Sequence, residues 1–128
     1  MAVEFSIQPR AEHIRVEISG EREAGRYVRD MLAGWSLVAN ECRVRSSYRI
    51  LGINRLRGSA PTTDAFEIAM AIPPLFRGTP VRLAQVVLGD DESRSANRFA
   101  EDVTVNRGIK ARNFSDEGAA LAWLLDAT

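Results

Sequence analysis

The sequence is poor in the residues that build cross-links and catalytic centres. Cys42 is the single cysteine, so the chain cannot form an internal disulfide, which points to a reducing compartment or to indifference to redox state. His13 is the single histidine and Lys110 the single lysine. Glycine-rich phosphate-binding motifs and the HExxH, CxxC and GxSxG motifs are absent. We therefore expect no enzyme activity, no metal site and no cofactor.

An excess of one charge and long apolar runs are also missing. Basic and acidic side chains number 17 each, and nonspecific binding of nucleic acid needs a basic excess. No run approaches the roughly 20 apolar residues that span a bilayer, and the start, MAVEFSIQPR, lacks the features of a signal peptide. At 128 residues and 45% hydrophobic composition, we expect one cytoplasmic domain over residues 1–128 with its own core.

The N-terminal third changes its hydrophobic period once. Apolar and polar residues alternate on both sides of Pro9-Arg10-Ala11, which predicts a hairpin of two strands ended by Gly20. From Glu21 to about Asn40 the apolar residues follow the helical i, i+3, i+4 spacing. A helix is predicted there, with acidic residues in its first turn.

The remaining residues alternate between short apolar runs and helical patterns. Strands are predicted at 48–53, 81–88 and 109–114. A helix opens at a capping box formed by Asp64 and Glu67 and is expected to stop at Pro73-Pro74. Further helices are predicted over residues 96–103, closed by Gly108, and after a Ser115 cap, with inward residues Ala120, Leu121, Leu124 and Leu125.

The resulting order, ββαβαβαβα, predicts an α/β fold: a five-stranded mixed sheet, mostly parallel, with about four helices and the first strand at or near an edge. With its opening hairpin, this order resembles the STAS domain of anti-sigma-factor antagonists. Three stretches carry a closer resemblance: Tyr48-Arg49-Ile50-Leu51 through Arg57-Gly58, residues 81–87, and parts of residues 98–124. The closer resemblance is to the SpoIIAA-like (STAS/SEC14) group of small bacterial proteins. It covers nearly the whole chain and implies a non-enzymatic regulatory or protein-interaction module with a protein partner.

The same resemblance implies a phosphorylation switch at the start of the second helix. The matching stretch is Ser59-Ala60-Pro61-Thr62-Thr63-Asp64, in which the acid follows the hydroxyls, whereas the family has it before them. Ser59, Thr62 and Thr63 are the candidate phospho-acceptors, with Asp64 in the same loop. The alternative is that these side chains only cap the helix.

Arginines supply a second candidate site. Arg43, Arg45, Arg49, Arg55 and Arg57 follow one another with no acid between them. In an extended strand the first three would share a face, and Arg55 and Arg57 would emerge at the strand's end, as phosphate partners or as an anion-binding pair. Pairing with surface Glu and Asp is the alternative. An anion site would make the protein a carrier of a small anionic ligand, a nucleotide or a lipid.

Three other residues have a structural and a functional interpretation. His13 and Cys42 are interpreted as packing or surface residues, since neither has a catalytic companion in the sequence. Trp123 lies slightly off the apolar line of the last helix, so it belongs either to the core or to a contact surface. A homodimer through a sheet edge or a helix face is also predicted, and the sequence does not choose between them.

Overall fold

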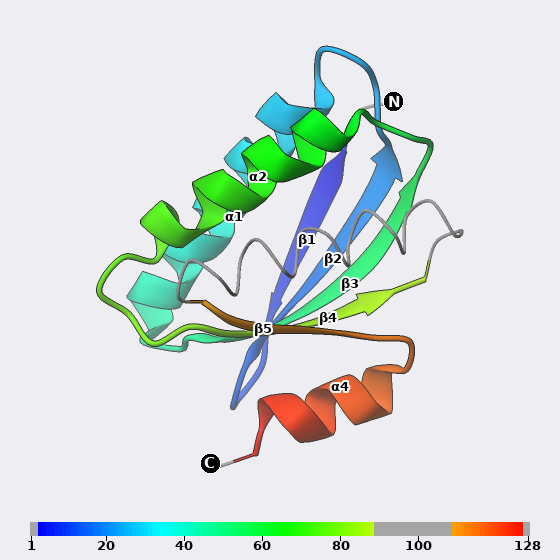
Figure 1. Cartoon of the computed structure of the whole chain (residues 1–128). Coiled ribbons are helices and arrows are strands. Elements are labelled where there is room, and N and C mark those ends of the chain that lie inside the picture. The colour runs from blue at the N-terminus through cyan, green and yellow to red at the C-terminus, as the bar shows by residue number, and fades with distance from the viewer. Residues whose placement is uncertain (1–2, 89–108, 127–128) are drawn as a thin grey trace.

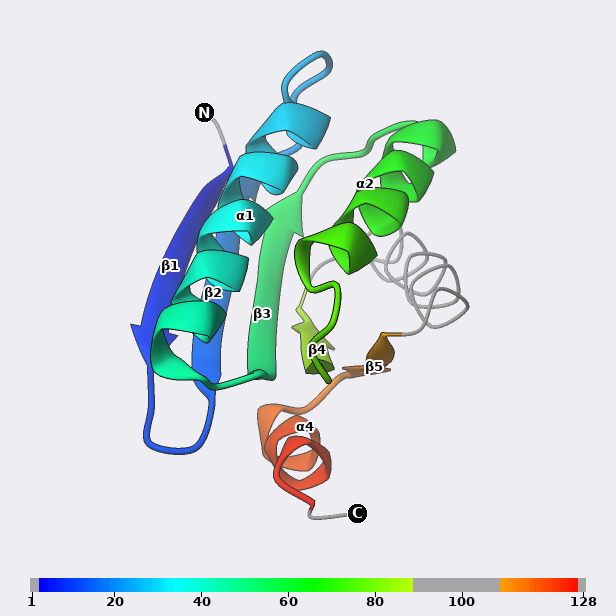
Figure 2. The same cartoon turned by 90° about the vertical axis from the view of Figure 1, so that its left-hand side faces the viewer.

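The computed structural model describes residues 3–88 and 109–126. They form a five-stranded sheet in the order β1-β2-β3-β4-β5, with helices on both faces. Helices α1 and α2 lie on one face and α4 lies on the other (Figures 1 and 2). The α/β class, the five strands and the mixed sheet are as predicted. The helix predicted over 96–103 and the cap at Gly108 lie outside the described residues.

The hairpin prediction is confirmed. Strand β1 (Glu4–Pro9) pairs antiparallel with β2 (Ile14–Glu21), and Phe5 lies opposite Ile18. β1 is at one end of the sheet, as expected. Strands β2, β3 (Arg49–Arg57), β4 (Arg82–Val87) and β5 (Lys110–Phe114) are mutually parallel. The parallel strands place all their carboxyl ends at one edge of the sheet.

The first helix differs from its predicted bounds at both ends. Helix α1 spans Tyr27–Arg45, so it begins six residues after Glu21, and its acidic first-turn residue is Asp30. β2 continues through Gly20 to Glu21 and takes up the residues assigned to the helix start. At the other end α1 includes Cys42, Arg43 and Arg45, because the chain leaves the helix only at Ser46, which has a left-handed φ of 51°. The prediction that Arg43, Arg45 and Arg49 share one strand face was therefore wrong.

Helix α2 (Thr62–Leu75) differs from the prediction in its N-cap and in the position of its two prolines. Its N-cap is Pro61 and no side chain caps it, so the predicted capping box of Asp64 and Glu67 does not form. The helix was predicted to stop at Pro73-Pro74, but both prolines lie inside its last turn. Neither proline has an N–H to donate to the carbonyl four residues before it, and the chain leaves the helix at Phe76, two residues after Pro74.

The last helix, α4 (Glu117–Leu124), is short and is capped by Asp116, whose carboxylate accepts a hydrogen bond from the Ala119 N–H. The predicted Ser115 cap is off by one residue. Ala120 and Leu124 are fully buried, as predicted, whereas Leu121 and Leu125 are only half-buried. A helix of two turns over a flat sheet buries a single stripe of side chains.

The sheet separates two apolar clusters. The larger lies between the sheet and α1 with α2 and includes Ile14, Val16, Ile18 and Trp35; the smaller joins Leu51, Ile53, Ala84 and Val86 to α4. Gly34 of α1 lets the helix lie close to β1, because a Cβ there would overlap the Phe5 ring. Phe5 in turn meets Trp35 edge-on, with ring centroids 5.9 Å apart.

Candidate functional site

The connection from β3 to α2 leaves the carboxyl edge of the sheet, where ligand and partner sites of open α/β sheets usually lie. Gly58 makes the turn with a φ of 82°, a backbone conformation that favours glycine. Arg22, in the connection from β2 to α1, holds this turn from the other side. Its backbone N–H donates to the Arg57 carbonyl and its guanidinium donates to the Gly58 carbonyl at 2.8 Å. Arg22 is not among the residues predicted for the site, because nothing in the local sequence distinguishes a buried arginine from an exposed one.

Beyond this anchored turn, the candidate phospho-acceptors are open to solvent. Ser59, Thr62 and Thr63 are exposed and Asp64 is half-buried. The α2 N-terminus has no side-chain cap, so the capping role considered for these hydroxyls is not seen. An uncapped N-terminus keeps backbone N–H groups and the positive end of the helix dipole turned to solvent. The structure thus brings the four residues together at a position that favours negative charge.

Arg55 and Arg57 project from a different face. In β3 the odd-numbered side chains lie on the α4 side of the sheet, with Leu51 and Ile53, whereas α2 packs on the opposite side. Arg55 contacts Glu17 at 3.1 Å and Arg57 contacts Glu21 at 3.5 Å, so each arginine already has a carboxylate partner. This is the alternative that the sequence analysis left open for them. The carboxylates balance the positive charge that an anion site would use.

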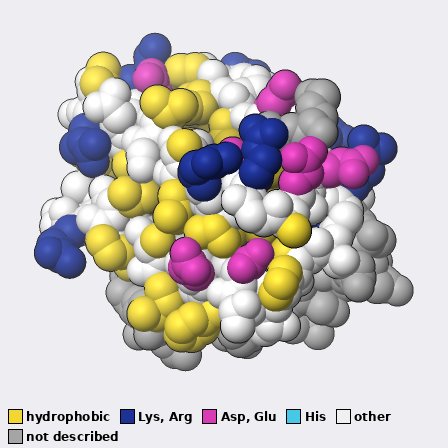
Figure 3. All heavy atoms as spheres, turned by 90° about the horizontal axis from the view of Figure 1, so that it is seen from above, with side chains coloured by type: hydrophobic (Ala, Val, Ile, Leu, Met, Phe, Trp, Pro, Cys, Tyr) yellow, Lys and Arg dark blue, Asp and Glu magenta, His cyan; other side chains and the backbone are white. Residues whose placement is uncertain are grey.

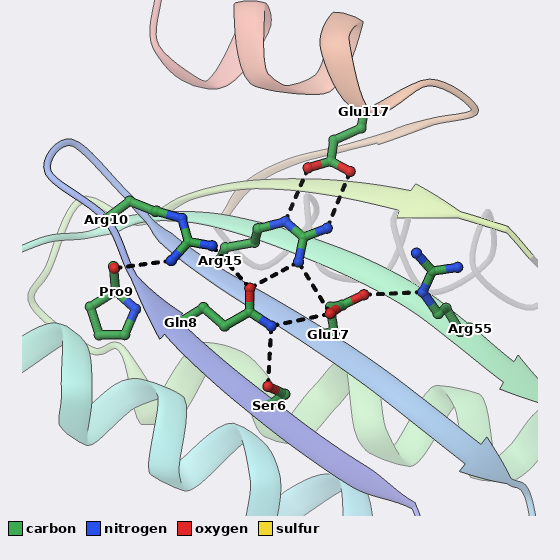
Figure 4. A network of polar contacts seen from close by, with 8 residues as sticks. All are labelled: Ser6, Gln8, Pro9, Arg10, Arg15, Glu17, Arg55 and Glu117. Carbon is green, nitrogen blue, oxygen red and sulfur yellow. Dashed lines mark hydrogen bonds and ion pairs between the residues drawn. The ribbon is translucent and has the colours of Figure 1, made fainter.

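The Arg55 pair belongs to a network on the open face of β1 and β2 (Figure 4). Arg15 lies at the centre of this network. Two nitrogens of its guanidinium donate hydrogen bonds to the Glu117 carboxylate of α4, at 3.0 and 3.2 Å, and a third donates to the Gln8 side chain. Gln8 donates to Ser6 and to Glu17. The hydrogen bond from Arg15 lowers the pKa of Glu117, and those from Gln8 and Arg55 lower the pKa of Glu17.

Trp123 is half-buried and lies against β4 and β5. The Arg82 guanidinium covers its ring at 3.9 Å from the centroid, and the Phe114 ring lies 5.7 Å away. Its indole therefore has an arginine on one side and a phenyl ring nearby. The interface role of Trp123 stays a prediction.

His13 and Cys42 lie apart from the β3–α2 connection. Cys42 is fully buried in α1, and burial raises the pKa of its thiol to about 11, so it is protonated at neutral pH. Burial and then Arg10 lower the pKa of His13, in the hairpin turn. Within residues 3–88 and 109–126, no three His, Cys, Asp or Glu side chains are grouped as metal ligands. The same residues include no helix long and apolar enough to cross a membrane.

The surface around the carboxyl edge mixes charges with apolar side chains. Figure 3, which looks down on this end, shows basic and acidic groups side by side, with apolar side chains between them. On α2, Phe66 is 42% and Met70 37% exposed. Thr62, Phe66 and Met70 are spaced by four residues, so they follow one stripe of the helix. A hollow of about 500 Å³ lies at the other end of α2, lined by Pro73, Phe76, Arg77 and Thr79 among others.

The comparisons with known proteins identify the fold. No protein-family model matches the sequence, and no sequence among the curated proteins does. A solved structure that is similar to it is an uncharacterized protein of the DUF3478 family with a SpoIIAA-like fold from Shewanella loihica PV-4. The TM-score is 0.56 at 15% identity, over 96% of this chain and 94% of that one. The chain therefore has a SpoIIAA-like fold.

Proposed function

We propose that residues 1–128 act as one non-enzymatic regulatory domain, which binds a protein partner through the β3–α2 connection and the exposed stripe of α2. The observation that carries the proposal is the position of Thr62 and Thr63. They are exposed in the first turn of an uncapped helix, and the apolar side chains of Phe66 and Met70 follow on the same helix surface. An exposed apolar stripe beside polar groups is typical of a protein-binding surface.

Phosphorylation of Ser59, Thr62 or Thr63 would switch this surface. A phosphate adds about two negative charges at neutral pH and is favoured beside a helix N-terminus. The negative charge of Asp64 in the same turn would repel the phosphate. Phosphorylation would therefore change both the electrostatic potential and the shape of the surface around this turn. The Arg22 anchor would keep the loop in place in both states, because it binds backbone carbonyls and not the hydroxyls.

The first test is partner binding by the purified chain in lysate of its own host. A Met70→Glu variant places a charge in the stripe, and Ala122→Glu places the same charge on exposed α4 as a control. A specific protein retained by the unmodified chain and by Ala122→Glu, but lost with Met70→Glu, supports the proposal. Equal retention by all three, or by none, contradicts it.

The second test is the intact mass of the protein from its host. A phosphate adds about 80 Da, and fragmentation should map it to Ser59, Thr62 or Thr63. A Thr62→Glu, Thr63→Glu double variant should change the affinity for the captured partner by at least tenfold in either direction. An unmodified mass in cells, together with unchanged affinity of the double variant, would rule out the switch while leaving the binding surface in place.

The carrier hypothesis has less support. Arg55 and Arg57 are paired with Glu17 and Glu21, and the hollow lined by Pro73 and Phe76 lies at the far end of α2 from them. An organic adduct in the native mass spectrum that is lost with Arg57→Ala would favour it over the interaction module.

A further inference from the structure

The outer edge of β1 offers hydrogen-bonding groups at two residues. The Arg10 N–H donates to the His13 carbonyl, which fixes the alternation of bonded and non-bonded pairs along the hairpin. Glu4, Ser6 and Gln8 therefore exchange their backbone hydrogen bonds with β2. The N–H and C=O groups of the odd-numbered residues point away from β2, and no described strand lies on that side.

Both ends of this outer edge are closed. The Val3 N–H donates to the Asp30 carboxylate of α1 at 3.3 Å. Pro9 has no N–H, and its carbonyl accepts from the Arg10 guanidinium. Proline and side-chain caps on an edge strand limit pairing with other chains. Between the two caps, Phe5 and Ile7 keep complete sets of outward backbone groups.

We propose that this edge pairs with β1 of a second copy of the chain, antiparallel and centred on Ser6. In that register Phe5 of one copy and Ile7 of the other form a hydrogen-bonded pair, and the two-fold axis repeats the pair. The register uses both open residues of each copy and requires neither Val3 nor Pro9. It also sets Glu4 against Gln8 on the polar face, so no like charges lie opposite each other. Neighbouring registers oppose Phe5 to Pro9 or Phe5 to itself and lose half of these bonds.

Helix α1 supplies the apolar part of the same interface. Asp30 reaches Val3 and Gly34 contacts Phe5, so this side of α1 faces β1. Leu37 and Val44 continue that stripe at seven-residue spacing, and they are 61% and 72% exposed. Figure 2 shows α1 lying across β1 and β2 at this edge of the sheet.

The two-fold axis would bring the α1 helices side by side. Strands in a sheet are about 4.8 Å apart, so helices over β1 and β2 of each copy would be separated by roughly 10 Å, the distance of packed helices. The exposed flanks with Leu37 and Val44 would then bury each other. A second copy of the chain fits this surface because the two-fold axis pairs β1 with β1 and packs the exposed flank of α1 against the same flank of the other copy.

Engineered cysteines test the register directly. Ser6 lies on the axis, so Ser6→Cys should form a disulfide between copies on mild oxidation, since facing residues of a non-bonded pair have Cα atoms about 4.5 Å apart. Glu4→Cys is the matched control on the same strand face: its copies would be about 14 Å apart and should not cross-link. Cys42 is fully buried and does not compete.

Sedimentation of the unaltered chain gives the second measurement. At about 100 µM, the range in which small interfaces are occupied, the mass should be twice 14.2 kDa. Leu37→Glu places two like charges across the axis and should weaken the dimer at least tenfold, and its exposure means that the monomer still folds. Phe66→Glu on α2 should leave the dimer intact. In the dimer the amides of Phe5 and Ile7 should also exchange with solvent at least tenfold more slowly than in Leu37→Glu.

Three results would overturn the proposal: a monomer at that concentration, a dimer broken by Phe66→Glu but not by Leu37→Glu, or equal cross-linking of Ser6→Cys and Glu4→Cys. A monomer at that concentration, or equal cross-linking of the two cysteine variants, leaves partner binding by α2 untouched, whereas a dimer broken by Phe66→Glu would assign the α2 stripe to contacts between copies.

Discussion

Arg82 of β4 lies over the Trp123 ring of α4 and also binds that residue's backbone. Its guanidinium carbon is 3.9 Å from the ring centroid, and its Nε and Nη2 donate to the Trp123 carbonyl at 3.1 and 2.6 Å. The carbonyl is one of the last four of α4, which have no partner within the helix. Arg82 therefore caps the C-terminus of α4 and fastens the helix to the sheet, while Arg15 fastens its N-terminus through Glu117.

This double role predicts that Arg82→Ala destabilises the fold. The variant removes two hydrogen bonds from a charged donor and a stacked guanidinium, and it leaves the Trp123 carbonyl with only the 3.3 Å hydrogen bond from the Asp126 N–H, at a cost of about 1–3 kcal/mol. Urea unfolding measures the loss. Arg29→Ala, at an exposed position of α1, should change stability by less than about 0.5 kcal/mol. Equal effects of the two substitutions would show that Arg82 does not hold α4.

Gly34 allows a second prediction about packing. A methyl group at this position overlaps the Phe5 ring, so Gly34→Ala should cost about 1–3 kcal/mol despite the better helix propensity of alanine. Phe5→Leu in the Gly34→Ala background should recover part of that loss, because the smaller side chain frees the space. Additive destabilisation by the two changes would argue against the contact.

The fold could be predicted from the sequence because several independent features of the sequence indicate the same order of strands and helices. The Pro9 turn, the alternation of Ile14, Val16 and Ile18, and the return of apolar strands all agree on the α/β order. Helix ends were less well predicted. Glu21 fits a helix start or a strand end equally well, and the choice is made by pairing with Arg57 of β3, a long-range contact.

The candidate site was predictable only in part. The position of the hydroxyls of Ser59, Thr62 and Thr63 at the start of α2 follows from the order of elements in the sequence. The environment of Arg55 and Arg57 does not, since the partners Glu17 and Glu21 are on another strand. The spacing of residues within one strand cannot show which charges the next strand places beside it. The same holds for Arg22, whose carbonyl partner lies 36 residues away.

Cys42 provides a prediction about reactivity. The thiol is fully buried and burial raises its pKa to about 11, so both access and thiolate content are low. The folded protein should react with a thiol reagent at least a hundredfold more slowly than the protein in urea. An Ala122→Cys variant, whose added thiol is at an exposed position of α4, serves as a positive control. Equal rates for folded and unfolded protein would show that α1 opens readily.

Glu117 predicts a specific pH dependence of stability. The hydrogen bond from Arg15 lowers the pKa of Glu117 below its usual 4.5 in the folded state. A carboxyl with a depressed folded pKa stabilises the protein above the unfolded value, and this contribution is lost as pH falls through the folded pKa. Glu117→Gln should therefore lower the free energy of unfolding at pH 7, by less than about 1 kcal/mol because the pair is partly exposed.

The difference between the unmodified protein and Glu117→Gln should shrink as the pH is lowered from 4.5, because protonated Glu117 resembles glutamine. Urea unfolding at pH 7 and at a pH well below 4.5 measures the two differences, and carboxylates common to both proteins cancel. Glu12→Gln, in the exposed hairpin loop, controls for the loss of one negative charge. A difference that stays constant or grows on acidification would mean that Arg15 does not hold α4 through the charge of Glu117.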